Sequence, residues 1–479
     1  LIPTPNGYTT MGKIAVGDAV FDERGNPCRV VAKSEVDYDE QAYRITFKDG
    51  EVIEAGENHQ WYGQWRSNNK LISGIVNTEW LYRRSLAPSR KSSLDFRIPM
   101  NGPIDTPEVN LPITPYLMGY WLGNGTATEA RITIQTCDVD EVIAKIQPFH
   151  QITSIWDNVG DSKHVYVPDL HCVLLPSFHD KVIPPAYLRA SRNQRLLLLQ
   201  GLMDSDGCIS DRKGQGIYCS AEKSLADNVS ELLWSLGIKN TVTASASTQR
   251  TDWGKPSVEC GRVLTGQTIY RVTFTVFADI QSAGLARKQS RAIRRNLGSR
   301  SQYRYIDSIV PIPNRGMQCI QVDSPSHQYL VGRSFLPTHN SELAAAIALY
   351  LLFADGEAGA EVYSCAADIN QASIVFNTAK AMVEQCGDLR NLSKLVPSTK
   401  RILFPHMNSF YRVLSSETKS KQGFNVSGLI FDELFAQQTR ELFDTMTKYT
   451  GDARRQPLYF LITTAGRDKT SICYEIHCK

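Results

Sequence analysis

The stretch FLPTHNSELAAAIALYLLF, residues 335–353, divides the chain into two parts of different texture. A strand-like segment stops at His339 and Asn340, and an apolar helical run follows from Ser341 with no Gly or Pro between them. Two abutting elements without turn residues indicate a junction between two units of the chain.

The residues before this junction fall into three regions. Residues 1–105 alternate apolar and polar side chains between Gly, Asp and Pro turns, as in YRITFKDGEVIEAG, which predicts short antiparallel strands. Residues 106–298 mix helical patterns such as SLADNVSELLWSLGI with strand-like YRVTFTVFA, so a mixed α/β insert is expected. Strand texture returns over residues 299–340.

The residues after the junction, 341–479, alternate helical and strand patterns. The runs VSGLIFDE and PLYFLITTAG are continuously apolar, which is typical of buried parallel strands. The whole sequence therefore predicts a multidomain chain, with an all-β domain split by an α/β insert and followed by an α/β fragment.

Composition agrees with several domains and gives few other constraints. The 479 residues suffice for about three domains, and 42% hydrophobic residues can form their cores. A net charge of +3 requires any nucleic-acid contact to come from local basic clusters. The 11 cysteines show no zinc-type spacing, which favours reduced thiols. We expect a fragment of a cytoplasmic protein without membrane contact, because it lacks a signal peptide and starts at Leu1.

The residues at the junction can support a self-cleavage reaction. The Asn340 side-chain amide can attack its own main-chain carbonyl, and ring closure of this kind has an effective molarity of about 10⁵ M or more. His339 can protonate the leaving amine, and the Ser341 hydroxyl can first accept an acyl group. By itself this tripeptide is more often a plain turn.

Four stretches in order resemble the inteins. They are LIPTPNGYTTMGKIAVGDAVFDERG near the start, AGENHQW at 55–61, CIQVDSPSHQYLV from Cys319, and PTHN before Ser341. The resemblance implies an all-β horseshoe splicing domain over 1–105 and 299–340, no cofactor for splicing, and an upstream extein as partner. It also implies that His59 assists breakage of the upstream junction and that Asp323 and His327 support later steps.

Most inteins begin with a nucleophilic Cys or Ser, but several residues would normally precede LIPTPNG in the family, so in a chain that begins with Leu1 the first nucleophile is not visible. A less common class uses a Cys, a Trp and a Thr elsewhere, and Cys319, Trp61 and Thr338 stand at those places. The resemblance implies that Cys319 attacks the upstream peptide bond as a thiolate and passes the acyl group to Ser341. Singly, Cys319 and Trp61 would be a structural thiol and a core aromatic. Gly56 stands where the family usually has a Thr.

Two stretches inside the insert, LMGYWLGNG at 117–125 and LQGLMDSDG at 199–207, resemble the LAGLIDADG homing endonucleases. The resemblance implies that two helices pack through their small residues. Asp206 and Asn124 would then hold Mg²⁺ at a shared base, and β-strands would bind the major groove of double-stranded DNA. Asn124 replaces the Asp of the family, so an inactive endonuclease that binds DNA is an alternative.

A basic stretch closes the insert and contains no acidic residue. Its cations are Arg287, Lys288, Arg291, Arg294, Arg295, Arg300 and Arg304. We predict contacts with DNA phosphates, and a solvated helix face is the alternative.

The last segment resembles the ATPase domain of large terminase subunits, which package phage DNA. In VSGLIFDEL an apolar strand is followed by Asp432 and Glu433, the form of a Walker B element that binds Mg²⁺ and activates water on ATP. LITTAG resembles the coupling motif of these ATPases. No complete Walker A loop is present. Ser341 and the helix after it would form its second half, and Ser341 would become a Mg²⁺ ligand once splicing supplies the Gly-Lys half.

The sequence thus predicts a self-splicing intein with an endonuclease insert, interrupting a phage terminase ATPase in an infected bacterial host. After splicing, the resemblance implies ATP and Mg²⁺ as cofactors, with the small terminase subunit and the portal as partners. Two other interpretations stay open: an autoprocessing domain that only cleaves, and an ATPase with a passive β insertion.

Overall fold

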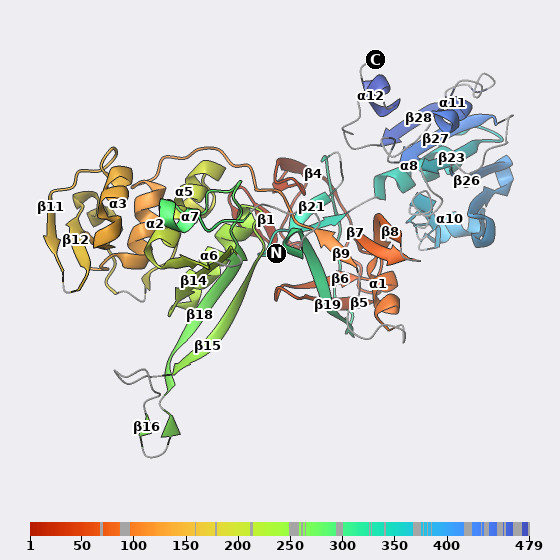
Figure 1. Ribbon diagram of the computed structural model, residues 1–479. Coiled ribbons are helices and arrows are strands. Elements are labelled where there is room, and N and C mark those ends of the chain that lie inside the picture. Colours follow the sequence, from red (N-terminus) through yellow and green to blue (C-terminus); the bar gives the residue numbers. More distant parts are fainter. Residues whose placement is uncertain are drawn as a thin grey trace.

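The computed structural model shows three bodies in a row (Figure 1). It describes residues 1–67, 70–86, 96–158, 160–177, 180–210, 214–248, 258–259, 262–263, 265–293, 300–324, 326, 328–339, 342–366, 375–376, 378–380, 382–384, 386–415, 424–432, 434, 440–447, 454, 457–462 and 472–477. The multidomain character predicted from the sequence is confirmed, while the horseshoe shape and the domain boundaries stay predictions.

The central body is built from strands on both sides of the insert. The neighbours in its largest sheet are, in order, β21 (Gln328–Val331), β22 (Leu336–His339), β7 (Gln60–Ser67), β9 (Arg97–Pro99), β19 (Tyr303–Ile312), β5 (Ala42–Phe47) and β6 (Val52–Gly56), and β8 (Lys70–Asn77) pairs with β7. A second sheet contains β20 (Ile320–Val322), β4 (Pro27–Lys33) and β3 (Ala19–Phe21), and β1 (Ile2–Thr4) pairs with β2 (Gly7–Thr9). The pairings are antiparallel, as alternation predicted.

Helix α1 (Thr78–Ser85) was not expected in this β region. The Asn77 side chain accepts the N–H of Trp80 at its start, and basic side chains at 83 and 84 stand in the last turn, where they complement the helix dipole. The helix buries Leu81 in the core of the central body. Capping therefore outweighed the alternating pattern here.

The insert contains two helix-and-sheet units, which confirms its mixed α/β character. The first has α2 (Pro115–Asn124), β10 (Arg131–Gln135), α3 (Val139–Ile146), β11 (Ser154–Asp157) and β12 (Ser162–Tyr166); the second has α4 (Pro185–Leu188), α5 (Arg192–Ser205), β13 (Gly207–Ile209), β14 (Gln215–Ser220), α6 (Lys223–Ser235), β15 (Asn240–Thr248), β18 (Thr265–Thr275) and α7 (Ala286–Gln289), besides the short pair β16 (Val258–Glu259) and β17 (Arg262–Val263). The strand orders are β10-β12-β11 and β13-β14-β18-β15.

The two motif helices of the insert pack closely through glycine. A Cβ on Gly119 of α2 would lie 2.2 Å from the Leu198 carbonyl oxygen, and one on Gly201 of α5 would lie 2.1 Å from the Tyr116 carbonyl oxygen. Because no larger side chain fits between these backbones, the expected packing through small residues is confirmed.

Within its described residues, the C-terminal body has one six-stranded sheet. Its order is β24 (Lys394–Val396), β25 (Arg401–Phe404), β26 (Ser409–Ser415), β23 (Glu361–Ala366), β27 (Val426–Asp432) and β28 (Leu458–Ile462), with helices α8 (Glu342–Phe353), α10 (Gly387–Leu392), α11 (Glu441–Thr447) and α12 (Ile472–His477). Strands β26, β23, β27 and β28 pair in parallel, which confirms the prediction from their apolar runs.

A small apolar cluster joins the central body to the insert. Phe335 and Leu330, beside the turn between β21 and β22, pack with Trp234 of α6. Phe335 has a φ of 51°, in the left-handed region. Within the insert itself, Arg189 pairs with Glu231 of α6 at 2.8 Å.

Among the helices that the structure describes, none is long and apolar enough to cross a lipid bilayer.

Candidate functional site: the His59 and Cys319 pocket

Strand pairing brings the junction segment to His59 of the first β region. In β22, His339 lies opposite Gln60 of β7. The turn that precedes β7 carries His59, whose backbone N–H donates to the Gly56 carbonyl at 3.2 Å. The residues just before Asn340 and the residues around His59 are therefore neighbours in one sheet, although about 280 positions separate them in the sequence.

The predicted residues His59 and Thr338 are in direct contact. His59 Nε2 and Thr338 Oγ1 share a short hydrogen bond, and the Thr338 hydroxyl donates to the Gln60 carbonyl at 3.2 Å. Since one hydroxyl hydrogen serves one acceptor, this arrangement makes His59 Nε2 the donor to Thr338 and leaves Nδ1 without a proton. Burial lowers the pKa of His59 to about 4, so the imidazole is neutral at pH 7.

Trp61 fixes the other side of His59. Its side chain is fully buried, its Nε1–H donates to Thr78 Oγ1 at 3.0 Å, and its ring meets the His59 ring edge-on with centroids 4.8 Å apart. Thr78, which the sequence analysis missed, also donates its backbone N–H to the His59 carbonyl at 3.0 Å. Trp61 is thus a core aromatic that also packs against the His59 ring.

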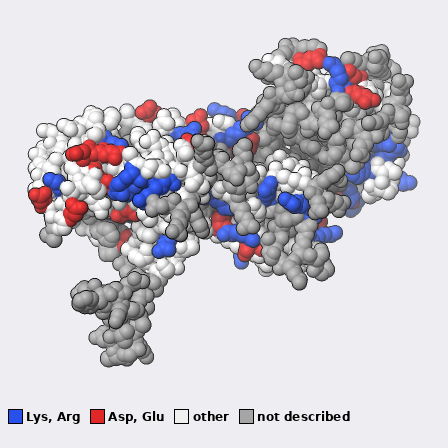
Figure 2. Space-filling model, viewed as in Figure 1, with Lys and Arg blue, Asp and Glu red and all other residues white. Residues whose placement is uncertain are grey.

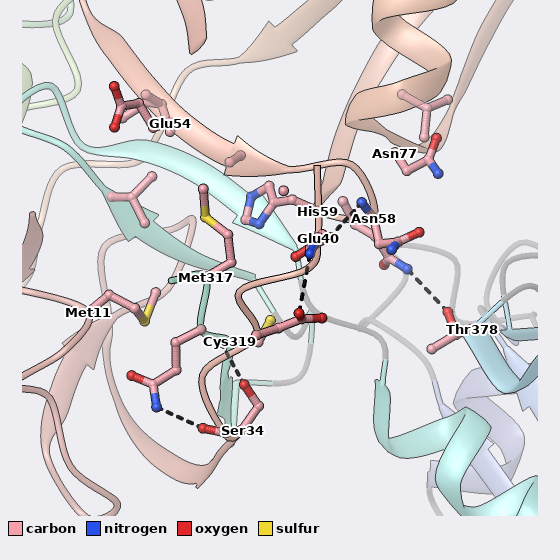
Figure 3. Close-up of a pocket in the computed structure, with 18 of the residues that line it drawn as sticks. Met11, Ser34, Glu40, Glu54, Asn58, His59, Asn77, Met317, Cys319 and Thr378 are labelled. Atoms are coloured by element: carbon pink, nitrogen blue, oxygen red, sulfur yellow. Dashed lines mark hydrogen bonds between the residues drawn. The ribbon is translucent and has the colours of Figure 1, made fainter. Parts of the chain in front are cut away.

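Cys319 and His59 line the same pocket (Figure 3). The pocket has a volume of about 1540 Å³, and Leu1, at the other end of the β region, also lines it. Ser34 holds Cys319 by two backbone contacts: the Cys319 N–H donates to Ser34 Oγ at 3.0 Å, and the Ser34 N–H donates to the Cys319 carbonyl at 2.9 Å. The backbone of Cys319 is therefore fixed beside the pocket.

The other predicted splicing residues are placed less completely. Asp323 is exposed and accepts the Arg29 backbone N–H at 2.7 Å, and it is not among the residues that line this pocket. His327, Asn340 and Ser341 lie outside the described residues, and only the backbone of His339 is described.

The two motif ends of the insert meet at one corner. A Cβ on Gly123 would lie 2.1 Å from Ser205 Oγ and 3.2 Å from Asp206 Cγ, so the glycine admits the acidic corner of the second motif. Asp206 is exposed and Asn124 is half-buried at the ends of their helices. The described part of the chain holds no cluster of three or more His, Cys, Asp or Glu side chains suited to a metal ion.

A buried lysine closes each motif helix, and neither role was predicted. Lys181 Nζ donates to the carbonyls of residues 121, 122 and 125, and Lys288 Nζ donates to those of residues 203, 204 and 207, at distances of 2.7 to 3.2 Å. Burial lowers the pKa of Lys181 to about 8. Although Asp206 keeps exposed surface, its packed surroundings desolvate the carboxyl and raise its pKa, and both ammonium groups oppose that rise.

The prediction of phosphate contacts is wrong for two cations of the basic stretch. Lys288 is only 6% exposed because it caps α5. Arg304 is fully buried in the central body, where its guanidinium pairs with Asp49 at 2.7 Å. A cation buried in this way cannot reach a DNA backbone.

The remaining cations of that stretch are partly placed. Arg287 pairs with both carboxylate oxygens of Asp138, at 2.6 and 2.5 Å, which lowers the pKa of that carboxyl. Arg291 is exposed and donates to the Ile209 carbonyl at 2.9 Å. Arg294 and Arg295 lie outside the described residues, as does the side chain of Arg300. Figure 2 shows basic side chains on this face with acidic ones close by, rather than one continuous basic field.

The predicted nucleotide site is only outlined. Asp432 ends β27, opposite Ile462 of β28, at the carboxyl edge of the parallel strands. Its side chain, Glu433, and the end of LITTAG lie outside the described residues. Strand order thus puts the backbone of Asp432 where ligands of open α/β sheets bind.

Comparison with known proteins gives two family matches. Residues 315–478 match the ATPase domain of the terminase large subunit, and residues 193–275 match a LAGLIDADG-like domain. The terminase match begins at residue 315, whereas β21 and β22 belong to the sheet of the central body.

A curated relative is similar over most of the chain. The chain is 30% identical over 360 residues to a replicative DNA helicase DnaB of Mycobacterium intracellulare, which covers 71% of this chain and 58% of that protein. The chain therefore spans little more than half the length of this relative.

Among solved structures, the MchDnaB-1 intein is 15% identical, with 71% of this chain and 95% of that one covered and a TM-score of 0.23. The large terminase of bacteriophage HK97 is 26% identical, with 28% of each chain covered and a TM-score of 0.25.

These matches define a composite protein with a LAGLIDADG-like segment and a segment similar to the terminase large subunit ATPase domain. The curated relative is named a helicase, yet this chain ends in a terminase-type segment. Similarity over 71% of the chain between two such different proteins fits an intein that both contain. The recognition made from the sequence is confirmed: a LAGLIDADG-containing intein joined to a terminase large subunit ATPase segment.

Proposed function

We propose that this chain carries out protein splicing, with Cys319 as first nucleophile. One observation supports this most: the pocket lined by Cys319 and His59 is also lined by Leu1, the described residue on the side of the upstream junction, while β22 ends at His339, opposite Gln60. Both junctions would then meet at one set of reactive groups.

In the proposed reaction the Cys319 thiolate attacks the carbonyl carbon of the upstream junction, and the amide nitrogen leaves. Ser341 takes over the acyl group, Asn340 cyclises and cuts the chain after itself, and His339 assists that step. His59 is neutral because its pKa is about 4, so it acts on the scissile amide through hydrogen bonding rather than as a cation. Asp323 and His327 are kept as assisting residues from the resemblance alone.

The test is the intact mass of this chain fused behind an upstream segment that ends in Gly-Lys. The parent should give a product in which that segment is joined to residues 341–479, and Cys319→Ala should give only cleavage after Asn340. A Cys319→Ala variant that still ligates would assign the first nucleophile elsewhere. Cys137→Ala, which changes an exposed cysteine, is the matched control.

We also propose that the insert binds double-stranded DNA and holds Mg²⁺ weakly. The observation in favour is the shared corner at Gly123, Asn124 and Asp206. One carboxylate and one amide oxygen suit Mg²⁺, which takes oxygen ligands and is often completed by phosphates. When bound, Mg²⁺ would polarise a phosphodiester for hydrolysis; Asp206 and Asn124 would hold it there.

Asn124→Asp should restore the second carboxylate of this corner and tighten Mg²⁺ binding about tenfold, measured by titration calorimetry. Asp206→Asn in the same background should abolish the gain. Equal affinities of parent and Asn124→Asp would remove these two residues from the metal site.

For the C-terminal segment we propose ATP hydrolysis after splicing, with Mg²⁺ held by Ser341 and Asp432 and water activated by Glu433. Its support is the terminase match together with the position of Asp432 at the carboxyl end of β27. The small terminase subunit and the portal are its proposed partners, and a cytoplasmic location follows from the same proposal.

A further inference from the structure

Glu40 occupies the space that a side chain at position 56 would need. A Cβ on Gly56 would lie 2.2 Å from Glu40 Cδ and from Oε2, and 2.4 Å from Oε1. The carboxylate therefore lies directly against the Gly56 backbone, three residues before His59. A β-carbon at position 56 would push this carboxylate aside, so the glycine is what allows Glu40 to lie there.

A hydrogen bond joins Glu40 to the turn of His59, and its chain segment pairs with the segment of Cys319. Its Oε1 accepts the Asn58 backbone N–H at 2.9 Å, within the turn that leads to His59. On its other side, the segment of Glu40 pairs with the segment of Cys319: the Asp37 N–H donates to the Met317 carbonyl at 2.8 Å, and the Met317 N–H donates to the Asp37 carbonyl at 2.7 Å. Glu40 thus bridges the chain segments of the two reactive residues.

Glu40, His59 and Cys319 all line the pocket, and Figure 3 labels them among the side chains that surround it. Burial raises the pKa of the Glu40 carboxyl, and the Asn58 N–H opposes the rise. A carboxylate of raised pKa is a better proton acceptor than an exposed one. The charged and titratable groups around it are Asp37 and Asp39 on its own segment, Glu57 and His59 on the turn, and Arg315 beside the Cys319 segment.

We propose that Glu40 is the general base for Cys319. The Cys319 S–H bond breaks and its proton goes to a Glu40 carboxylate oxygen, while the sulfur electron pair forms the bond to the upstream carbonyl carbon. The C–N bond then breaks, and Glu40 returns the proton to the departing nitrogen. Thiol and amide become thioester and amine, and Glu40 ends ionised. This inference rests on the proposed splicing function.

The test uses Glu40→Gln, which keeps the shape and the Asn58 hydrogen bond but cannot take up a proton. In an Asn340→Ala, Ser341→Ala background only the Cys319 attack can proceed, and added thiol then releases the upstream segment. Release should slow by about 10²-fold in Glu40→Gln. Glu57→Gln, on the same turn but outside the pocket lining, should release at the parent rate.

A second measurement decides the inference even where no release occurs. Iodoacetamide labelling of Cys319 against pH, read by peptide mass spectrometry, reports the thiol pKa directly. Glu40→Gln removes a negative charge adjacent to the thiol, so the thiol pKa and with it the pH midpoint of labelling should fall by about one unit. A lower thiol pKa favours the thiolate, whereas release should become slower. Labelling of the exposed Cys137 is the internal reference.

The outcomes separate the two proposals. A lower labelling midpoint with slower release supports Glu40 as base. An unchanged midpoint overturns it, whatever the release rate, because the carboxylate then lies too far from the thiol. A parent that releases nothing overturns the proposed splicing function, while the labelling still shows whether Glu40 faces Cys319.

Gly56→Ala provides an independent variant. Its Cβ would displace the Glu40 carboxylate without altering any titratable group, so release should slow as in Glu40→Gln. Gly12→Ala adds a Cβ where nothing lies within 4 Å and should leave release unchanged. Normal release by Gly56→Ala would contradict the inference.

Discussion

The hydroxyl of Thr338 sets the protonation pattern of His59. It is fully buried and lies between an imidazole nitrogen and a backbone carbonyl, so both of these depend on it. Removing such a partner leaves buried polar groups unpaired, which costs about 1–3 kcal/mol each. A single oxygen thereby couples the segment before the junction to the histidine of the other β segment.

Thr338→Val should remove this coupling while keeping the side-chain shape. We expect a lower melting temperature, slower ligation, and a changed tautomer of His59 in the nitrogen NMR spectrum, because Nε2 loses its acceptor. Thr338→Ser should restore the tautomer. If the His59 nitrogen shifts stay the same in Thr338→Val, the hydroxyl does not select the tautomer.

The stability of the central body should fall in mild acid because of His59. Its pKa is about 4 in the folded chain and about 6.5 when unfolded, so the unfolded state binds more protons between these values. The contribution of neutral His59 to the free energy of unfolding is complete above pH 6.5 and is lost as the pH falls toward 4. His59→Gln should flatten the dependence of the melting temperature on pH in this window. A parent curve that is already flat there would contradict the lowered pKa.

At the scale of elements, the close packing of α2 against α5 holds the insert together. Their glycines bring two helix backbones into contact, and each helix ends at a buried lysine that satisfies its last carbonyls. This arrangement explains why the motifs combine small residues with polar ends.

Gly201→Ala should separate these helices. Its Cβ would lie 2.1 Å from the Tyr116 carbonyl oxygen, and overpacking of this kind costs about 1–3 kcal/mol. We expect a lower melting temperature and weaker Mg²⁺ binding at the shared corner. Gly387→Ala, which adds a Cβ with no atom within 4 Å, is the control in calorimetry. Equal melting temperatures for both variants would show that the helix pair can shift apart at no cost.

At the scale of the whole molecule, the insert packs directly against the central body. Trp234 of α6 packs against Phe335 and Leu330, and the Arg304 guanidinium lies 4.6 Å from the centroid of its ring. Arg304 is in turn held by Asp49 and by the Ser334 hydroxyl at 2.7 Å. The hairpin that leads to the junction therefore rests on the insert.

Trp234→Ala should loosen that hairpin. Truncating a buried Trp costs about 3–5 kcal/mol, and we expect faster hydrogen exchange over residues 330–336 together with slower cleavage after Asn340. Trp156→Ala, which removes a tryptophan that is 40% exposed, is the control. Unchanged exchange over the hairpin would mean that the insert gives it no support.

Much of this organisation could be predicted from the sequence. Apolar periodicity predicted the strands of residues 1–105, the mixed insert and the parallel strands of the last segment, because the period of burial is a local property of each element. Ordered motifs indicated Cys319, Trp61, Thr338 and Asp206 because reactive groups and close helix contacts need particular residue types. Helix α1 was missed, since its cap is a single Asn77 contact in a region of alternating residues.

Only the tertiary structure decided which of the named residues meet and which cations are available. The fit of Glu40 against Gly56 arises from segments that pair across the fold, so no local pattern announces it. Lys288 and Arg304 looked like surface charge in the sequence, yet one caps a helix and the other joins Asp49 in a core. Residue type and spacing determine the possible chemistry and the local elements, whereas burial and pairing depend on contacts between distant positions, which arise only when the chain packs.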